Sequence, residues 1–194
     1  MDTVTPLKQL YLIVACVMGA YFALNFAVFP QTYQDVPVAA PQPSIDITLS
    51  TPQIRLGESF ELSITATNNG EEADLQTVTV GFPQNQNLDN IQIKSYDFLQ
   101  SPRLFLPEQQ IGTDYTGGQT MVQSKYPFIE AYNRPAKPGL THSMTLQITP
   151  TTTGAFTIYS KTVAMPHIND LSHFPLDGII DHQNEFVLEH TVMV

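Results

Sequence analysis

Residues 58–70 read ESFELSITATNNG, and this segment decides the fold of most of the chain. From Phe60 onward an apolar side chain occupies every second position, and Glu, Ser or Thr stands between them. A period of two is typical of a β-strand with one face buried and one face in solvent. Asn68, Asn69 and Gly70 follow with turn chemistry, because Asn and Gly tolerate positive φ. The segment therefore predicts a half-buried strand that ends in a tight turn.

The same alternation appears elsewhere in the chain. It recurs over residues 44–50, 144–149 and 185–194, more weakly over 91–99, and over 155–164 after turn residues at 151–154. These segments predict seven or eight strands at the spacing of a β-sandwich, with no helical pattern among them. The only cysteine, Cys16, precedes them all, so no disulfide can join them and the fold must depend on its apolar core.

A different pattern lies near the N-terminus, where residues 10–29 read LYLIVACVMGAYFALNFAVF. This stretch has no charged residue, and about 20 apolar residues suffice to cross a bilayer as a helix. It is longer than the apolar core of a signal peptide, and no small-x-small cleavage site follows it closely. We therefore expect an uncleaved, single-pass anchor in the cell membrane. Lys8 predicts a cytoplasmic N-terminus and an extracytoplasmic C-terminal part.

The anchor carries small residues at every fourth position, Ala15, Gly19, Ala23 and Ala27. Small residues at this spacing form a stripe along which a second helix can approach closely, and Asn25 could hydrogen-bond across such a contact. We expect this helix-packing face to meet a partner subunit or a second copy of the chain, which would give a homo-oligomer. The alternative is that the stripe reflects only how common Ala and Gly are in spanning helices.

These patterns divide the chain into four parts. We expect a cytoplasmic N-terminus at 1–9, a transmembrane helix at 10–29, a proline-rich stalk at 30–43 and an extracytoplasmic β-sandwich at 44–194. Within the last part the alternation fades at about 100–140, which predicts an irregular insertion of the kind that carries binding surfaces. We expect short strands inside it, near 103–106, 120–123 and 128–132.

Aromatic residues in and beside this insertion are candidate partner contacts. They are Tyr115, Tyr126, Phe128 and Tyr132, with Tyr96 before them. The alternative, which we favour, is that most of these rings cap the core, because buried aromatic side chains outnumber those at interfaces.

One part of the sequence resembles a known family. Residues 54–60 read IRLGESF and residues 65–70 read TATNNG, so a Gly-acidic pair, an alternating strand and an Asn-x-Gly turn at Asn68 and Gly70 follow one another. This pattern resembles the opening hairpin of CARDB-type and related immunoglobulin-like adhesion modules. The resemblance implies an all-β fold, an immunoglobulin-like antiparallel β-sandwich, on a prokaryotic cell surface, and for this chain we expect an archaeal one. It implies a binding or spacer unit and names no partner.

Charge and motifs exclude several functions. The chain after Pro30 holds seven Lys or Arg and seventeen Asp or Glu, which argues against binding nucleic acid. No nucleophile elbow, phosphate loop or His-Glu-x-x-His motif occurs, so we expect no catalytic residue and no cofactor. A polar loop from His167 to His182 could hold copper or zinc, but its spacing fits no known ligand set, and a blue-copper site would need a cysteine there.

The sequence therefore predicts a membrane-anchored interaction or structural protein. It would be an accessory subunit or envelope-binding module of a larger assembly, with membrane or cell-envelope proteins as partners. Two alternatives stay open at this point. One is an archaellum- or pilus-associated anchor that binds the envelope layer, and the other is a metal-handling extracytoplasmic domain that uses the loop from His167 to His182.

Overall fold

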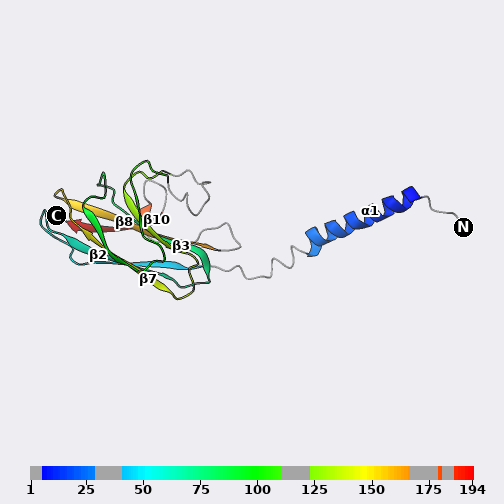
Figure 1. Ribbon diagram of the computed structural model, residues 1–194, viewed down its shortest axis with the longest axis horizontal. Helices are drawn as coiled ribbons and strands as arrows, with labels where there is room; N and C mark the ends of the chain where they lie inside the picture. The colour runs from blue at the N-terminus through cyan, green and yellow to red at the C-terminus, as the bar shows by residue number, and fades with distance from the viewer. Residues whose placement is uncertain (1–5, 29–40, 111–122, 167–178, 181–185) are drawn as a thin grey trace. The chain divides into compact units, whose positions relative to one another are not determined.

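The computed structural model describes residues 6–28, 41–110, 123–166, 179–180 and 186–194. The chain forms two compact units, residues 1–38 and residues 39–194. The first contains a helix and the second contains all ten strands of the described chain (Figure 1).

The N-terminal unit is one helix with an irregular last turn. Helix α1 spans Pro6–Ala23 and continues as a π-helical turn, η1, over Leu24–Val28. The 20 residues from Lys8 to Ala27 have a mean hydropathy of 1.9, and none of this stretch is buried within the protein. At 1.5 Å per residue an α-helix of this length measures about 30 Å, which is the thickness of a bilayer's hydrocarbon core. The helix is thus long and apolar enough to span a membrane.

The second unit consists of two antiparallel sheets. The four-stranded sheet has the order β1-β2-β7-β4, formed by Pro43–Leu49, Phe60–Asn68, Thr141–Ile148 and Ile91–Tyr96. The six-stranded sheet has the order β5-β6-β3-β8-β10-β9, formed by Arg103–Phe105, Phe128–Asn133, Ala73–Gly81, Ala155–Pro166, Phe186–Met193 and Ile179–Ile180. In Figure 1, β2 and β7 lie in one layer, and β3, β8 and β10 lie in the other.

The order of the strands is that of an immunoglobulin sandwich, in which strands A, B, E and D form one sheet and C, F and G form the other. Here β1, β2, β3, β4, β7, β8 and β10 take the places of A to G in sequence order. The remaining strands lengthen the second sheet, β5 and β6 beside C and β9 beside G. The expected fold class, an all-β immunoglobulin-like sandwich with one N-terminal apolar helix, is confirmed.

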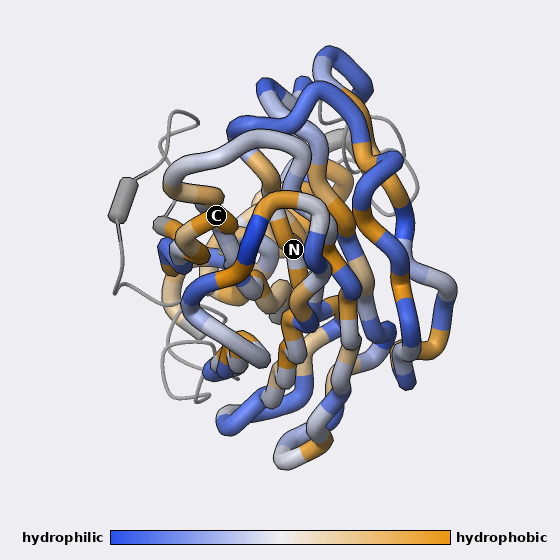
Figure 2. The backbone as a smooth tube through the Cα atoms, turned by 90° about the vertical axis from the view of Figure 1, so that its left-hand side faces the viewer, coloured by the Kyte–Doolittle hydropathy of each residue, from blue (hydrophilic) through white to orange (hydrophobic). Residues whose placement is uncertain are grey.

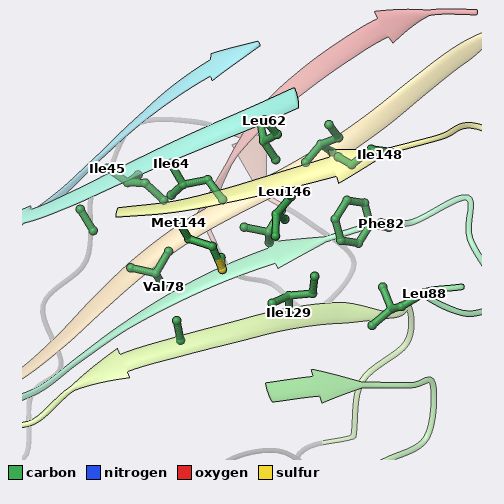
Figure 3. Close-up of a cluster of buried hydrophobic side chains, with 14 of the residues drawn as sticks. Ile45, Leu62, Ile64, Val78, Phe82, Leu88, Ile129, Met144, Leu146 and Ile148 are labelled. Carbon is green, nitrogen blue, oxygen red and sulfur yellow. The ribbon is translucent and has the colours of Figure 1, made fainter. Parts of the chain in front are cut away.

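The core lies between the two sheets (Figure 3). Phe60, Leu62, Ile64, Leu146 and Ile148 face it from the four-stranded sheet and are almost completely buried. The six-stranded sheet faces them with buried side chains that include Val78, Val80, Ile129, Ile158 and Val192. Along the strands, apolar and polar residues alternate, as the changing colour of the tube in Figure 2 shows. The alternation read from the sequence therefore assigned the buried faces of these strands correctly.

The turn at Asn68 to Gly70 differs from its prediction. We expected a hairpin with positive φ, but β2 and β3 belong to different sheets, so residues 69–72 carry the chain from one sheet to the other. Among the described residues, positive φ occurs elsewhere, at Gly57, Gly139, Gly154 and Glu108. Residues 149–154 likewise link β7 to β8 across the sandwich rather than within one sheet.

Asn68 is fully buried at this crossing and uses its whole side chain in hydrogen bonds. Its Oδ1 accepts from the backbone N–H groups of Gln42 (3.0 Å) and Gly70 (3.1 Å). Its Nδ2 donates to the carbonyl oxygens of Glu71 (2.6 Å) and Ala136 (3.1 Å). An amide can donate two hydrogen bonds, and its oxygen can accept two. Asn68 therefore joins the start of β1, the crossing and the segment before β7.

The region expected to be an irregular insertion contributes two strands. The short strands expected near 103–106 and 128–132 occur as β5 and β6, and β6 lies inside the sheet beside β3. The third, near 120–123, falls mostly outside the described residues. The total of ten strands exceeds the seven or eight expected, because the sequence around β6, β9 and β5 does not alternate over a recognisable length.

Candidate functional site

The proposed helix-packing face is exposed along the N-terminal unit. Ala15, Gly19 and Ala23 lie on α1, whereas Ala27 lies in η1. A Cβ atom added at Gly19 would meet no atom within 4 Å, so a larger side chain fits the helix itself. Asn25 donates from Nδ2 to the carbonyl oxygen of Tyr21 at 2.8 Å, which satisfies part of this amide inside its own helix. Packing against a second helix stays a prediction.

The π turn affects the geometry of the small-residue stripe. In an α-helix four residues advance about 400°, so residues spaced by four drift about 40° around the axis at each step. A π turn closes i→i+5 hydrogen bonds and rotates less per residue. The rotation from Ala23 to Ala27 is therefore smaller than over four residues of an α-helix.

The candidate aromatic contacts are largely buried where the structure describes them. Tyr126, Phe128 and Tyr132 are each less than 9% exposed, and Tyr115 lies outside the described residues. The Tyr126 ring lies so close to Gly81 that a Cβ atom there would overlap it, and Phe128 stacks on Phe105 at 4.7 Å. This burial agrees with the alternative that these rings cap the fold. Partner contact through them stays a prediction.

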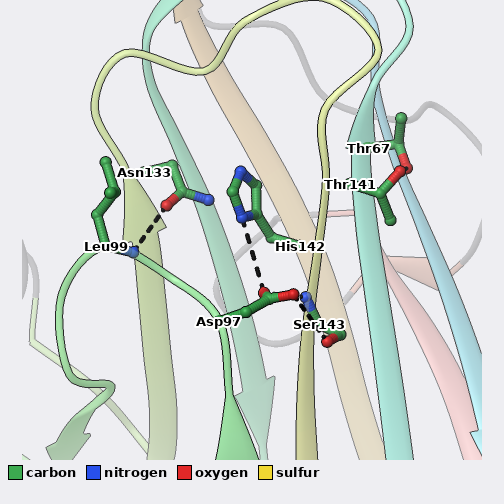
Figure 4. Close-up of polar contacts among 7 residues, drawn as sticks. All are labelled: Thr67, Asp97, Leu99, Asn133, Thr141, His142 and Ser143. Atoms are coloured by element: carbon green, nitrogen blue, oxygen red, sulfur yellow. Dashed lines mark hydrogen bonds and ion pairs between the residues drawn. The ribbon is translucent and has the colours of Figure 1, made fainter.

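A polar cluster at the end of β4 invites comparison with a catalytic triad, because it contains Asp97, His142 and Ser143 (Figure 4). Asp97 Oδ1 lies 3.7 Å from His142 Nδ1. However, the Ser143 hydroxyl donates to Asp97 Oδ2 at 3.1 Å, and its backbone N–H donates to Asp97 Oδ1 at 2.6 Å. A nucleophilic serine needs a hydrogen bond to the imidazole base. The carboxylate therefore extends the pairing of β4 with β7, and the cluster does not have the arrangement of a triad.

Metal binding has no support in the described residues, which include no group of three or more His, Cys, Asp or Glu side chains placed to hold an ion. The loop from His167 to His182 lies outside the described residues, apart from Ile179 and Ile180. His190, at the end of the chain, lies 3.3 Å from the Ser160 hydroxyl through Nε2. It is half-buried on β10.

Exposed apolar side chains gather on one short segment, residues 96–106, which we call the β4–β5 segment. It links the edge strand of one sheet to the edge strand of the other. The exposed residues are Tyr96, Leu99, Leu104 and Leu106. Leu99 is 70% exposed and Leu104 is 56% exposed. Exposed apolar residues that cluster in this way mark contact sites more often than isolated ones do.

Hydrogen bonds hold the β4–β5 segment in place. The Leu99 backbone N–H donates to Asn133 Oδ1 at 3.0 Å (Figure 4), and the Tyr96 hydroxyl lies 2.9 Å from the Ser101 hydroxyl. Leu104 pairs with Ile129, so both side chains lie on the inner face of the sheet. Ile129 is completely buried but Leu104 is not, because β5 extends the longer sheet beyond the cover of the shorter one.

Sequence reasoning missed these leucines as a candidate surface. The available signal was the run from 99 to 106, LQSPRLFL, in which three leucines stand among polar residues and a proline. We read the aromatic rings of the insertion as the contact candidates instead. Ring chemistry alone does not separate a buried aromatic side chain from an exposed one.

The strand edges of the sandwich form a second type of surface. Each sheet ends in edge strands, which are β1 and β4 in one sheet and β5 and β9 in the other. Unpaired N–H and C=O groups on an edge can pair with a strand from another chain.

Comparison with known proteins found no sequence family and a set of solved structures with low similarity to this chain. No family model matches the sequence, and no curated protein matches it. Among solved structures, the chain is similar to a CARDB domain of a Pyrococcus furiosus protein, determined in complex with di-metal ions, at 12% identity and a TM-score of 0.40. That match covers 81% of this chain and 96% of the other.

Two further solved structures have comparable scores. An uncharacterised protein from Nocardia farcinica with an immunoglobulin-like fold matches at 10% identity and a TM-score of 0.41, over 76% of this chain and 98% of the other. AvmM, which catalyses macrocyclisation in alchivemycin A biosynthesis, matches at 12% identity and a TM-score of 0.44, over 82% and 96%. These similarities agree with the expected resemblance to CARDB-type and immunoglobulin-like modules. They concern the fold, which hosts binding domains and enzymes alike.

Proposed function

We propose that this protein is a non-catalytic interaction module of the cell envelope, tethered to the membrane by α1. The observation that carries the proposal is the β4–β5 segment, whose backbone is held at Leu99 by a hydrogen bond and at Leu104 by strand pairing, and whose leucine side chains are exposed. Held in this way, the leucines lose little conformational entropy on contact and offer apolar area to a protein partner. The uncovered apolar helix supports a membrane location, with the C-terminal domain outside.

The partner would be a membrane or cell-envelope protein, and the chain its accessory subunit. The small-residue face of α1, with Ala15, Gly19 and Ala23, would meet a helix of that partner. A prokaryotic, archaeal surface fits the acidic composition and the lack of disulfides. An archaellum- or pilus-associated anchor is the narrower version of this proposal, and retention of the protein on isolated envelope layer would favour it.

The test is affinity purification of the tagged full-length protein from its own membranes in mild detergent, with mass spectrometry of what is retained. The variant with Leu99→Ser and Leu104→Ser should lose a defined partner that the wild type retains. The matched control replaces Leu56 and Leu140, which are 53% and 48% exposed but lie elsewhere, with serine. Equal recovery from all three proteins, or recovery of the bait alone, would contradict the proposal.

The same purification tests the anchor. Gly19→Ile should leave the helix intact, because no atom lies within 4 Å of the added Cβ, so loss of a membrane partner would report on the neighbouring helix. Unchanged recovery with both Gly19→Ile and Ala23→Ile would remove helix packing from the proposal and leave the role of the β4–β5 segment standing.

A further inference from the structure

The backbone of β1 directs alternate hydrogen-bonding groups away from the sandwich. The register pairs Ile45 with Ala66 and Ile47 with Ile64. Two flanking bonds, from Ser50 N to Glu61 O and from Asn69 N to Gln42 O, both 2.9 Å, identify which pairs exchange hydrogen bonds. In an antiparallel ladder bonded and non-bonded pairs alternate. Even-numbered residues of β1 therefore bond to β2, and the N–H and C=O groups of Ile45, Ile47 and Leu49 point outward along the free edge.

The other edge strands of the described sandwich are less suited than β1 to pair with a strand from another protein. Strand β4 has an irregularity between Ile93 and Ser95, where exposed Lys94 reaches Gln147. Strands β5 and β9 are only three and two residues long. Bulges, lysines and short lengths are the usual protections of sheet edges. Strand β1 has seven residues, an uninterrupted register and no lysine.

The side chains of β1 define what could lie beside it. Ile47 and Leu49 face the core but are only partly buried, because none of the described strands pairs with β1 on its outer flank. On the opposite face, Asp46 is exposed, and Glu61 on β2 is exposed as well. Residues 41–74 contain six acidic residues and one basic residue. An added strand would thus be apolar on its inner positions and positively charged on its outer ones.

We propose that β1 receives an extended segment of a partner protein, in which apolar residues alternate with Lys or Arg, as a fifth strand of the four-stranded sheet. Main-chain bonds to Ile45, Ile47 and Leu49 would supply affinity, and the alternate side chains would supply specificity. A second copy of this chain is disfavoured as the occupant, because pairing two β1 edges would bring two strongly acidic regions together.

This inference goes beyond the proposed function, because it concerns a different surface and a different mode of contact. The β4–β5 segment offers exposed side chains, whereas β1 offers backbone groups. Failure of one test leaves the outcome of the other unchanged, since Leu99 and Leu104 take no part in pairing along β1.

The experiment uses the full-length protein in detergent micelles and a seven-residue capped peptide of alternating Lys and Val as the probe. Amide hydrogen exchange by NMR follows Ile45, Ile47 and Leu49. We expect the probe to slow exchange at these three amides and not at Ile93 on the β4 edge, and a peptide with Glu in place of Lys to bind more weakly. Absence of protection, or equal binding of the Glu peptide, would overturn the proposal. Protection without any peptide, together with a doubled mass, would assign the edge to a second copy.

Two variants keep the test specific. Ile47→Pro removes an outward N–H without breaking the β1–β2 ladder, and should weaken probe binding about tenfold, as loss of a hydrogen bond at the contact implies. Its matched control is Ile93→Pro on the β4 edge, where the residue is also partly buried and its N–H also points away from β7, as the bond from Thr149 N to Asn90 O and the register of β4 with β7 indicate. Asp46→Lys, on an exposed side chain, should also weaken binding and leave the fold intact. Unchanged binding by Ile47→Pro and Asp46→Lys would refute the inference.

Discussion

At the scale of single residues, His190 is an ionisable group that the fold holds against protonation. It is half-buried on β10, and its Nε2 lies 3.3 Å from the Ser160 hydroxyl. Burial lowers the pKa of His190 below its ordinary value of 6.5, because a charged imidazolium loses hydration in the sheet. The unfolded chain therefore takes up a proton at a higher pH than the folded chain.

This difference predicts a pH dependence of stability. The contribution of His190 is fully present above pH 6.5 and is lost as the pH falls from there towards the lowered pKa of the folded state. We expect the free energy of unfolding to decrease over this range and His190→Gln to flatten the decrease, measured by urea unfolding of the full-length protein in detergent at several pH values. His142→Gln is the control, and a slope that is unchanged by His190→Gln would contradict the assignment.

At the scale of the elements, the sequence predicts well which side chains of a strand are buried. It predicts poorly which strands pair with one another. Alternation in residues 60–67 and 144–149 identified the buried side chains correctly, because burial follows from each strand's own pattern. It could not tell a hairpin from a crossing between sheets at Asn68, because both use the same turn residues. Strand β6 was expected only as a short strand near 128–132 inside an insertion, and not as a central strand, because all six of its residues are buried and its sequence does not alternate.

The candidate site could be predicted to a similar extent. The sequence predicted a contact surface within or beside the region of about 100–140. The exposed Leu104 and Leu106 lie in that region, and contact through them stays a prediction. Which side chains are exposed depends on the unequal width of the two sheets, and therefore on pairings between residues distant in sequence such as Leu104 and Ile129. No local pattern contains that information.

The crossing between β2 and β3 gives a prediction at this scale. Asn68→Ala would remove four hydrogen bonds that join three segments, including those that the N–H groups of Gln42 and Gly70 donate to the Asn68 side chain. We expect it to lower the free energy of unfolding by about 2–4 kcal/mol. Urea unfolding measures the change. Asn69→Ala, which loses one exposed hydrogen bond to Ser44, should stay within about 0.5 kcal/mol of wild type. Similar losses for both variants would show that the buried network is not what stabilises the crossing.

At the scale of the whole molecule, the apolar core belongs to one unit. Every member of the main cluster lies between Ile45 and Val194, and Cys16, the only cysteine, lies in α1. The sandwich thus needs neither the helix nor a disulfide to bury its core. Its last strand, β10, pairs with both β8 and β9. The backbone of residue 193 also bonds to residues 52 and 54, so β10 joins the segment after β1 to the six-stranded sheet.

This organisation predicts that residues 41–194 fold without the anchor. The fragment should be soluble and monomeric, and should unfold in one cooperative transition that a reducing agent does not shift. Size-exclusion chromatography and circular dichroism during urea titration test this. A further truncation that removes residues 186–194 should aggregate, because it uncovers the edge of β8. A fragment 41–194 that aggregates or unfolds without cooperativity would show that the N-terminal unit contributes to the core.

The hydrogen bonds between Gln42 and the crossing from β2 to β3 also have a mechanical consequence. The chain enters the sandwich at residues 41–42, where the Gln42 N–H bonds to the Asn68 side chain and its carbonyl accepts from Asn69 N. With α1 held in a membrane, tension on the domain would reach this point before any other part of the sandwich. Through the bond from Asn68 to Ala136, part of that load would pass directly to the segment before β7 rather than to β1 alone. The crossing would thus carry part of a pulling force that the membrane-held helix transmits, and would oppose the separation of β1 from β2.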